Sequence, residues 1–185
     1  MRALTPFAPI AFVLSLLVAL PVGARPLGDA EQAGLTKAVD AYGRATTDGD
    51  AAKIVATIPP RILSVFAGST GLEAKKVEET LVGQTKDLMK NTKISGFVVA
   101  PGPFDATDAT LADGTALVWV IVPAQFNADT NGQKTLNHQP LFAVLEDGHW
   151  YFSRVDGPQQ QQVVAMAYPC IAEAKLPAAQ STPAP

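Results

Sequence analysis

The chain contains few of the residues on which much protein chemistry depends. Its 185 residues include one cysteine and two histidines, and only 17% are charged. Because Cys170 is the sole cysteine, an intramolecular disulfide is excluded, which leaves a free thiol or an intermolecular bridge. A serine-nucleophile elbow of the Gly-x-Ser-x-Gly type and a phosphate-binding Gly-x-x-x-x-Gly-Lys-Ser/Thr loop are also absent from the sequence. These absences leave no recognisable catalytic motif.

The chain also lacks an excess of positive charge. Its formal net charge is −3, whereas nucleic-acid binding depends on clustered Lys and Arg. Four lysines fall on one segment, but Glu78, Glu79 and Asp87 are interspersed among them. This pattern is typical of a solvated helix face. We therefore expect no nucleic-acid partner.

A long apolar run occurs only at the N-terminus. Residues Phe7 to Leu20 are apolar, Arg2 precedes them, and Val22 and Ala24 supply small residues before a plausible cleavage point. This pattern predicts a signal peptide over residues 1–24, cleaved after Ala24. The run is shorter than the roughly 20 residues that a membrane-spanning helix needs. We expect a periplasmic or secreted protein that is not held at a membrane after cleavage.

The rest of the chain divides into a helical part and a strand-rich part. Helical spacing over residues 29–47, a shorter helix after Asp50, a turn beginning at Pro60, and a capping box formed by Thr70 and Glu73 predict helices up to Asn91. Strand-like runs follow at residues 93–100, 116–126, 134–145 and 149–155, with a short helix over residues 158–168. The sequence predicts one α+β domain over residues 25–170, with helices on a strongly curved antiparallel sheet. The Pro- and Ala-rich residues 171–185 are expected to be disordered.

The turn dipeptides also predict strand register. A turn at Asn131 and Gly132 pairs Leu145 with Val118, Ala143 with Val120 and Leu141 with Val122, unless a bulge at Pro123 exchanges the faces beyond it. A two-residue turn at Asp147 and Gly148 places Glu146 opposite His149, where the two side chains form either a solvated charge contact or a catalytic pair. In this register His138 lies eight positions along the ladder from His149, which is roughly 26 Å at the usual strand rise. The two histidines therefore cannot share a metal ion. We predict neither a metal site nor a cofactor.

The segment ALVWVIV at residues 116–122 is apolar on both faces of its predicted strand. Both faces must therefore be covered, and we expect the helices to cover only the aliphatic one. The opposite face carries Trp119, Phe142 and Tyr151. An exposed apolar patch of this kind is uncommon on a monomer. We therefore expect a homodimer or a ligand on this face.

Several segments resemble one known superfamily. They are AVDAYGRATTDGDAAKIVATI (residues 38–58), with Tyr42 on its helix and a break at Gly49 and Asp50, and the hairpin EDGHWYF (residues 146–152). Together they are similar to the cone-fold superfamily of nuclear transport factor 2, polyketide cyclases and ketosteroid isomerase. Residues 68–94 and 150–169 look like exported bacterial members without an assigned role. The resemblance covers about residues 29–169 and implies a cone-like fold with a pocket between helices and sheet.

The resemblance also suggests site residues. The pocket would be lined by Tyr42, Phe66, Trp150 and Phe152, with Arg154 placed to meet an anionic or polar group. Tyr42 aligns with the oxyanion-hole tyrosine of ketosteroid isomerase. That enzyme's general base would fall at or near Phe66, and a phenylalanine cannot abstract a proton.

Three functional hypotheses follow from the sequence. The first is an exported, non-enzymatic, dimeric domain whose pocket binds a small apolar or amphipathic molecule or is filled by side chains. The second is an isomerase, dehydratase or cyclase that uses Tyr42 as a hydrogen-bond donor and Asp105 or Asp108 as a base. The third is an envelope interaction module that uses the aromatic face of its sheet.

Overall fold

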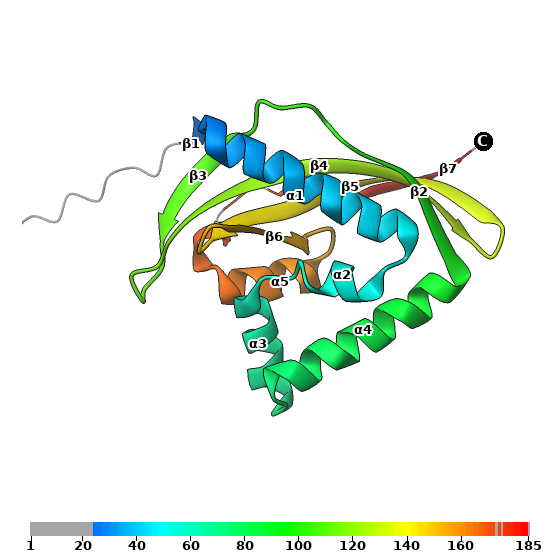
Figure 1. Cartoon of the computed structure of the whole chain (residues 1–185), viewed down its shortest axis with the longest axis horizontal. Coiled ribbons are helices and arrows are strands. Elements are labelled where there is room, and N and C mark those ends of the chain that lie inside the picture. Colours follow the sequence, from blue (N-terminus) through cyan, green and yellow to red (C-terminus); the bar gives the residue numbers. More distant parts are fainter. Residues whose placement is uncertain (1–23, 173, 175, 185) are drawn as a thin grey trace, which may run out of the picture.

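The computed structural model describes residues 24–172, 174 and 176–184. The apolar segment of the predicted signal peptide lies outside the described residues. The described chain is an α+β fold, as predicted, with a seven-stranded antiparallel sheet, five α-helices and one 3₁₀ turn (Figure 1).

Four helices precede most of the sheet. They are α1 (Asp29–Asp48), α2 (Ala51–Val55), α3 (Pro60–Thr70) and α4 (Ala74–Asn91). Helix α1 ends at Gly49, whose φ of 68° lies in the left-handed region that glycine adopts readily. The Asp50 carboxylate then accepts a 3.1 Å hydrogen bond from the Lys53 backbone and caps α2. These boundaries agree with the helical spacing of the sequence.

The predicted capping box at Thr70 and Glu73 is wrong. Helix α3 continues through Gly68 to Thr70, and Gly71 ends it with a φ of 68°. The Thr70 hydroxyl donates back to the Phe66 carbonyl at 2.7 Å instead of capping α4. Helix α4 has Glu73 at its N-cap without a side-chain hydrogen bond. The left-handed Gly71 therefore separates the two helices, and Thr70 belongs to the first of them.

The strands are β1 (Ala24–Pro26), β2 (Thr92–Val99), β3 (Asp105–Thr110), β4 (Ala116–Thr130), β5 (Gln133–Glu146), β6 (His149–Arg154) and β7 (Gln180–Pro183). The main order is β1-β3-β4-β5-β6, and β2 and β7 pair with the remaining lengths of β4 and β5. The short strands β1, β3 and β7 have no counterpart in the sequence analysis. In particular, β7 pairs with β5 inside the tail that was expected to be disordered.

The predicted register is confirmed. Glu146 pairs with His149 across the β5–β6 turn, and Leu145 pairs with Val118 across the β4–β5 hairpin. Asp147 and Gly148 have φ values of 50° and 76°, as a tight two-residue hairpin turn requires. The register between β4 and β5 also continues without a bulge past Pro123, which pairs with Pro140.

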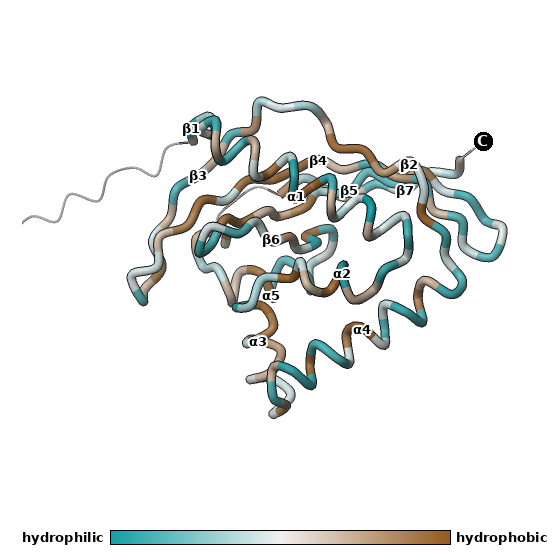
Figure 2. The backbone as a smooth tube through the Cα atoms, in the orientation of Figure 1, coloured by the Kyte–Doolittle hydropathy of each residue, from teal (hydrophilic) through white to brown (hydrophobic). Residues whose placement is uncertain are grey.

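Helices cover both faces of the sheet, whereas the sequence analysis expected them on one. Helix α1 packs on the aliphatic face, where Leu35 and Val39 meet Val120 and Val122. On the other face, Ile62 of α3 joins residues from α5 (Pro158–Ala167) and the 3₁₀ turn η1 (Pro169–Ile171). Figure 2 shows that the central strands are hydrophobic along much of their length. Helix α5 and the turn η1 therefore pack on the face for which the sequence predicted no helix.

No helix among the described residues combines the length and the apolar character that crossing a membrane requires.

Candidate functional site

The predicted pocket around Tyr42 is filled by aromatic side chains. The Tyr42 ring lies 5.6 Å from Phe97 and 5.4 Å from Phe152, measured between ring centroids. Phe152 is only 2% exposed. Burial raises the pKa of Tyr42, and the charge of Arg154 partly opposes this rise. These contacts make Tyr42 part of the core.

Of the remaining predicted pocket residues, Trp150 shares the core with Tyr42, whereas Phe66 does not. Trp150 packs on the same core, close enough to α1 that a Cβ added at Gly34 would lie 3.2 Å from its indole nitrogen. Phe66 belongs to the core on the opposite face of the sheet. The prediction that Phe66 and Tyr42 line one pocket is therefore wrong, because α3 packs with α5 and not with α1.

The Arg154 guanidinium forms an ion pair with Asp156. Its guanidinium donates two hydrogen bonds to the Asp156 carboxylate, and its side chain is 54% exposed. It does share a face with Phe152 and Trp150 on β6, as the register predicted. Its charge is paired with Asp156 within the chain, and its predicted role toward a ligand stays a prediction.

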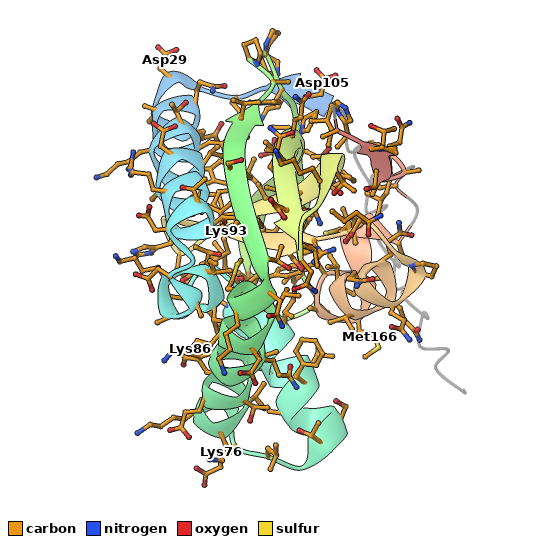
Figure 3. The ribbon with its side chains drawn as sticks, turned by 90° about the vertical axis from the view of Figure 1, so that its right-hand side faces the viewer. Asp29, Lys76, Lys86, Lys93, Asp105 and Met166 are labelled. Carbon is orange, nitrogen blue, oxygen red and sulfur yellow. The ribbon has the colours of Figure 1, made fainter. Side chains whose placement is uncertain are left out.

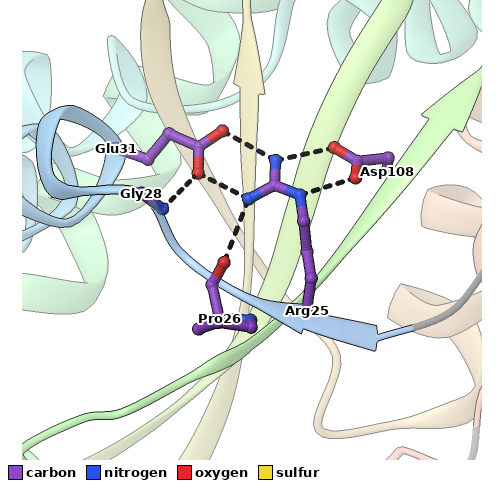
Figure 4. A network of polar contacts seen from close by, with 5 residues as sticks. All are labelled: Arg25, Pro26, Gly28, Glu31 and Asp108. Atoms are coloured by element: carbon purple, nitrogen blue, oxygen red, sulfur yellow. Dashed lines mark hydrogen bonds and ion pairs between the residues drawn. The ribbon is translucent and has the colours of Figure 1, made fainter.

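The two candidate catalytic bases, Asp105 and Asp108, are not placed as the enzyme hypothesis expects. Asp108 accepts hydrogen bonds of 2.6 and 2.7 Å from Arg25, whose guanidinium also binds Glu31 at 2.8 Å (Figure 4). Arg25 lowers the pKa of Asp108, which makes this carboxylate a weaker base. Asp105 immediately precedes the buried Ala106, so its side chain points to the face of β3 opposite the α1 core. Among the described residues, no hydrogen bond joins Tyr42 to a carboxylate.

One buried polar cluster escaped the sequence analysis. Glu146, which is 7% exposed, binds the Arg61 guanidinium and accepts a 2.8 Å hydrogen bond from the Tyr168 hydroxyl. Arg61 also contacts Asp113 at 2.9 Å. The expected contact between Glu146 and His149 is absent here, and the His149 Nδ1 instead lies 2.9 Å from the Asp147 carbonyl oxygen. All acceptors are satisfied within the chain, so the cluster joins α3 to the sheet and offers no open site.

The face that was expected to bind a second subunit is partly covered within the chain. Phe142 is fully buried, and its ring lies 5.4 Å from that of Tyr168. Trp119 and Tyr151 pack on the same core and are partly buried. At Phe142 the predicted dimer face is therefore covered within the chain, whereas Trp119 and Tyr151 are only partly buried, and a homodimer stays a prediction.

An open hollow does lie farther along this face. Two adjoining hollows of about 470 and 490 Å³ share Ala100, Pro101 and Pro123. Together they follow alternate residues of β4, from Trp119 to Gln125, between the β2–β3 loop and the chain that leads to β7. We call this feature the proline channel, and its lining is rich in one residue type: Pro101, Pro103, Pro123, Pro140 and Pro177.

The proline channel is apolar along its middle and polar at its ends. Gln125 and His138 lie at one end, and Asp105 and Thr107 at the other. Among the described lining residues, Asp105 alone carries a formal charge at neutral pH. The Nε1 atom of Trp119 is buried and has no hydrogen-bond partner in the described part of the chain. The middle of the channel therefore presents an apolar surface large enough for a small molecule.

Sequence reasoning missed this channel because its residues come from distant segments. The one available signal was the placement of Pro123 and Pro140 in the middle of apolar strands, where proline is rare. The register that we predicted places these two prolines opposite each other, which the structure confirms. The loop and tail residues that complete the channel had no predicted position.

A larger hollow of about 820 Å³ lies beyond the C-terminal end of α1, and its character is different. Its lining includes four charged residues: Asp48, Lys93, Asp129 and Lys134. Charged and exposed linings of this kind are typical of the solvated surface rather than of a ligand pocket. No group of three or more metal-binding side chains occurs in residues 24–172, 174 and 176–184.

Comparison with protein-family models yields no match, and no curated protein or solved structure matches the chain.

Proposed function

We propose that this protein is an exported, non-enzymatic domain that binds an apolar or amphipathic small molecule in the proline channel. The observation that carries the proposal is an exposed apolar lining. Val98 at the wall of the channel is 54% exposed, and Pro123 on its floor is also exposed. Covering such side chains stabilises a complex by roughly 25 cal/mol for each Å² removed from water.

The volume of the channel supports a small ligand. Each of the two hollows, at about 470 and 490 Å³, lies within the 300–1,000 Å³ that is common for ligand pockets. The interior around Tyr42, by contrast, is filled by Phe97 and Phe152. Binding on the outer face of the sheet therefore requires less rearrangement than opening the core.

The non-enzymatic part of the proposal rests on the acids. Asp108 is paired with Arg25, and Glu146 is paired with Arg61 and Tyr168. Asp105 at one end of the channel faces apolar and proline residues, without an oriented partner among the described residues. A general base needs a reacting group within hydrogen-bond reach and a suitable pKa, and this site supplies no such constellation.

Export and ancestry are further parts of the proposal. The basic, apolar and small-residue pattern before Arg25 supports cleavage of a signal peptide and a periplasmic or secreted location. The succession of helices followed by an antiparallel meander supports membership of the cone-fold superfamily. In this chain the sheet would be a curved variant whose interior pocket is closed and whose binding site lies on the opposite face.

The proposal is tested with an apolar fluorescent probe. We expect anilinonaphthalene sulfonate to gain fluorescence on the folded protein, and Val98→Asp to remove most of that gain. Leu88→Asp is the matched control, because Leu88 is 58% exposed on α4 and lies outside the channel lining. Both changes place a charge at an exposed apolar position, so neither should unfold the chain. Equal loss of probe binding in both variants would contradict the proposal.

A second candidate function is an envelope interaction module, and one observation favours it. Helices α3 and α4 form an arm on which Leu72 and Leu88 are 43% and 58% exposed. Figure 3 shows Lys76 near the far end of this arm, away from Asp105. Cross-linking in the native envelope would separate the two functions. Partner capture that is lost in Leu88→Asp and retained in Val98→Asp would favour the interaction module.

A further inference from the structure

We infer that the outer edge of β2 binds an extended peptide segment of another protein, which adds a strand to the sheet in the groove between β2 and α1. The segment carries one acidic and one basic side chain two positions apart, and these face Arg44 and Asp40 of α1. This inference goes beyond the proposed function, because it concerns a second site and does not require a ligand in the proline channel.

The groove lies between two elements that run side by side in opposite directions (Figure 3). Gly43 of α1 lies beside Phe97 of β2. Nearer the start of the helix, Gln32 lies beside Gly102 in the β2–β3 loop. A hollow of about 490 Å³ lies between the two elements along this length. It extends on the helix from Gln32 to Thr47, a rise of about 22 Å, which accommodates about six or seven residues of extended chain.

The outer edge of β2 has no partner strand among the described residues. On its inner side β2 pairs with β4, and just after β2 the Ala100 backbone N–H donates to the Pro123 carbonyl at 3.1 Å. Main-chain groups alternate in direction along a strand, so the N–H and C=O of Val99 point away from β4. Unpaired edges of this kind accept an additional strand. Val99 also lines the groove, so a peptide in the groove can form hydrogen bonds with this edge.

The wall formed by α1 matches the repeat of an extended chain. Thr36, Asp40 and Arg44 follow one another at four-residue intervals, and all three line the groove. Four helical residues rise about 6 Å, whereas two strand residues span about 6.6 Å. Every second side chain of an added strand can therefore meet a successive residue of this wall.

Asp40 and Arg44 carry opposite charges and have no ion-pair partner among the described residues. Both residues are exposed. A peptide with a basic side chain opposite Asp40 and an acidic one opposite Arg44 complements both charges. The lining also contains the aromatic rings of Phe97 and Phe104, so apolar side chains suit the flanking positions of the peptide.

The test uses two blocked, fluorescein-labelled peptides, TVTKTETVT and TVTETKTVT, which have the same composition and differ only in the order of their charges. We expect the wild type to bind one of them several-fold more tightly than the other in fluorescence anisotropy titrations. The double variant Asp40→Arg with Arg44→Asp keeps the net charge and should reverse this preference. Lys37→Glu changes an exposed charge on α1 outside the groove lining and should keep it. Equal binding of the two peptides, binding of neither, or an unchanged preference in the double variant would overturn the inference.

Methylated peptides test the strand pairing separately from the charges. Methylation of every second backbone nitrogen removes the N–H donors on one edge of the extended peptide and leaves the other edge intact. One of the two methylation patterns should weaken binding at least ten-fold, and the other should change it little. The Val99 amide should also exchange more slowly with solvent when the better peptide is bound, while that of the buried Val122 should not change. Equal effects of the two patterns would overturn the inference. Protection of Val99 that rises with protein concentration without peptide would show a second copy at this edge and would overturn it too.

Discussion

The Tyr168 hydroxyl donates a 2.8 Å hydrogen bond to Oε2 of Glu146, although the two residues lie 22 positions apart. This bond joins the end of α5 to the tip of the β5–β6 hairpin, and Arg61 from α3 binds the other carboxylate oxygen. Burial and the adjacent carboxylate both raise the pKa of Tyr168, so the phenol remains protonated and continues to donate. Three elements that are distant in sequence therefore meet at one carboxylate.

Removing this hydrogen bond should destabilise the fold. Tyr168 is fully buried, and a hydrogen bond to a charged group contributes about 1.5–3 kcal/mol. We expect Tyr168→Phe to lower the free energy of unfolding by about that amount in urea titrations. Tyr151→Phe is the control, because its hydroxyl has no hydrogen bond among the described residues. Equal stability of the two variants would show that Glu146 does not depend on the phenol.

Stability should fall in acid because paired carboxylates must be protonated. Glu31 beside Arg25 has its pKa lowered to about 2, and Thr115 and Arg61 likewise lower the pKa of Asp113 to about 2. Because these values lie below those of the unfolded chain, near 4, the stabilisation is present above about pH 4 and is lost as the pH falls towards about 2. Urea titrations between about pH 6 and 2.5 should show this loss.

Arg25→Ala should remove part of that pH dependence. Without the guanidinium, the pKa values of Glu31 and Asp108 move back towards their ordinary range, while that of Asp113 does not change. We therefore expect a shallower decrease of stability below about pH 4 than in the wild type. Arg44→Ala removes the same charge from the surface of α1 and should leave the slope unchanged. A slope in Arg25→Ala as steep as that of the wild type would contradict the ion pairs seen here.

Two glycines in helices should respond in opposite ways to alanine. A Cβ added at Gly43 would lie 2.6 Å from Cδ1 of Phe97, whereas one at Gly83 would meet nothing within 4 Å. We expect Gly43→Ala to destabilise by about 1–3 kcal/mol, as overpacking usually does. Gly83→Ala should stabilise by up to about 1 kcal/mol through helix propensity. Thermal unfolding of both variants checks this pair, and a stabilised Gly43→Ala would show that α1 can move away from β2.

The sequence predicted those parts of the fold that local chemistry controls. Asp147 and Gly148 specified a two-residue turn, so the register of β5 and β6 followed from the turn alone. Helix α1 could be predicted because Leu35, Val39 and Tyr42 recur at helical spacing. By contrast, β3 reads DATDAT and carries little apolar or β-branched signal beyond its threonines. It forms because β1 and β4 pair with it on both sides.

The Glu146 cluster and the proline channel were harder to predict, because both depend on contacts between segments that are distant in the sequence. The partner of Glu146 is Arg61, which is 85 positions away and cannot be inferred from spacing. The aromatic face seemed open because α5 has ten residues and a weakly periodic sequence. That face is nevertheless covered by the buried side chains of Val164 and Ala167 in α5 and of Tyr168 and Ile171 after it. The proline channel is the part of the face that this cover does not reach.

The position of Arg25 links the predicted cleavage site to the ion pairs that join β3 to α1. Cleavage after Ala24 would make Arg25 the first residue of the mature protein, and its guanidinium joins β3 to the start of α1. An exopeptidase that trimmed a single residue from this new terminus would sever both carboxylate bonds at once. Resistance of the cleaved protein to such enzymes would then depend on how well the pairing of Arg25 with Ala106 in the β1–β3 ladder protects that terminus.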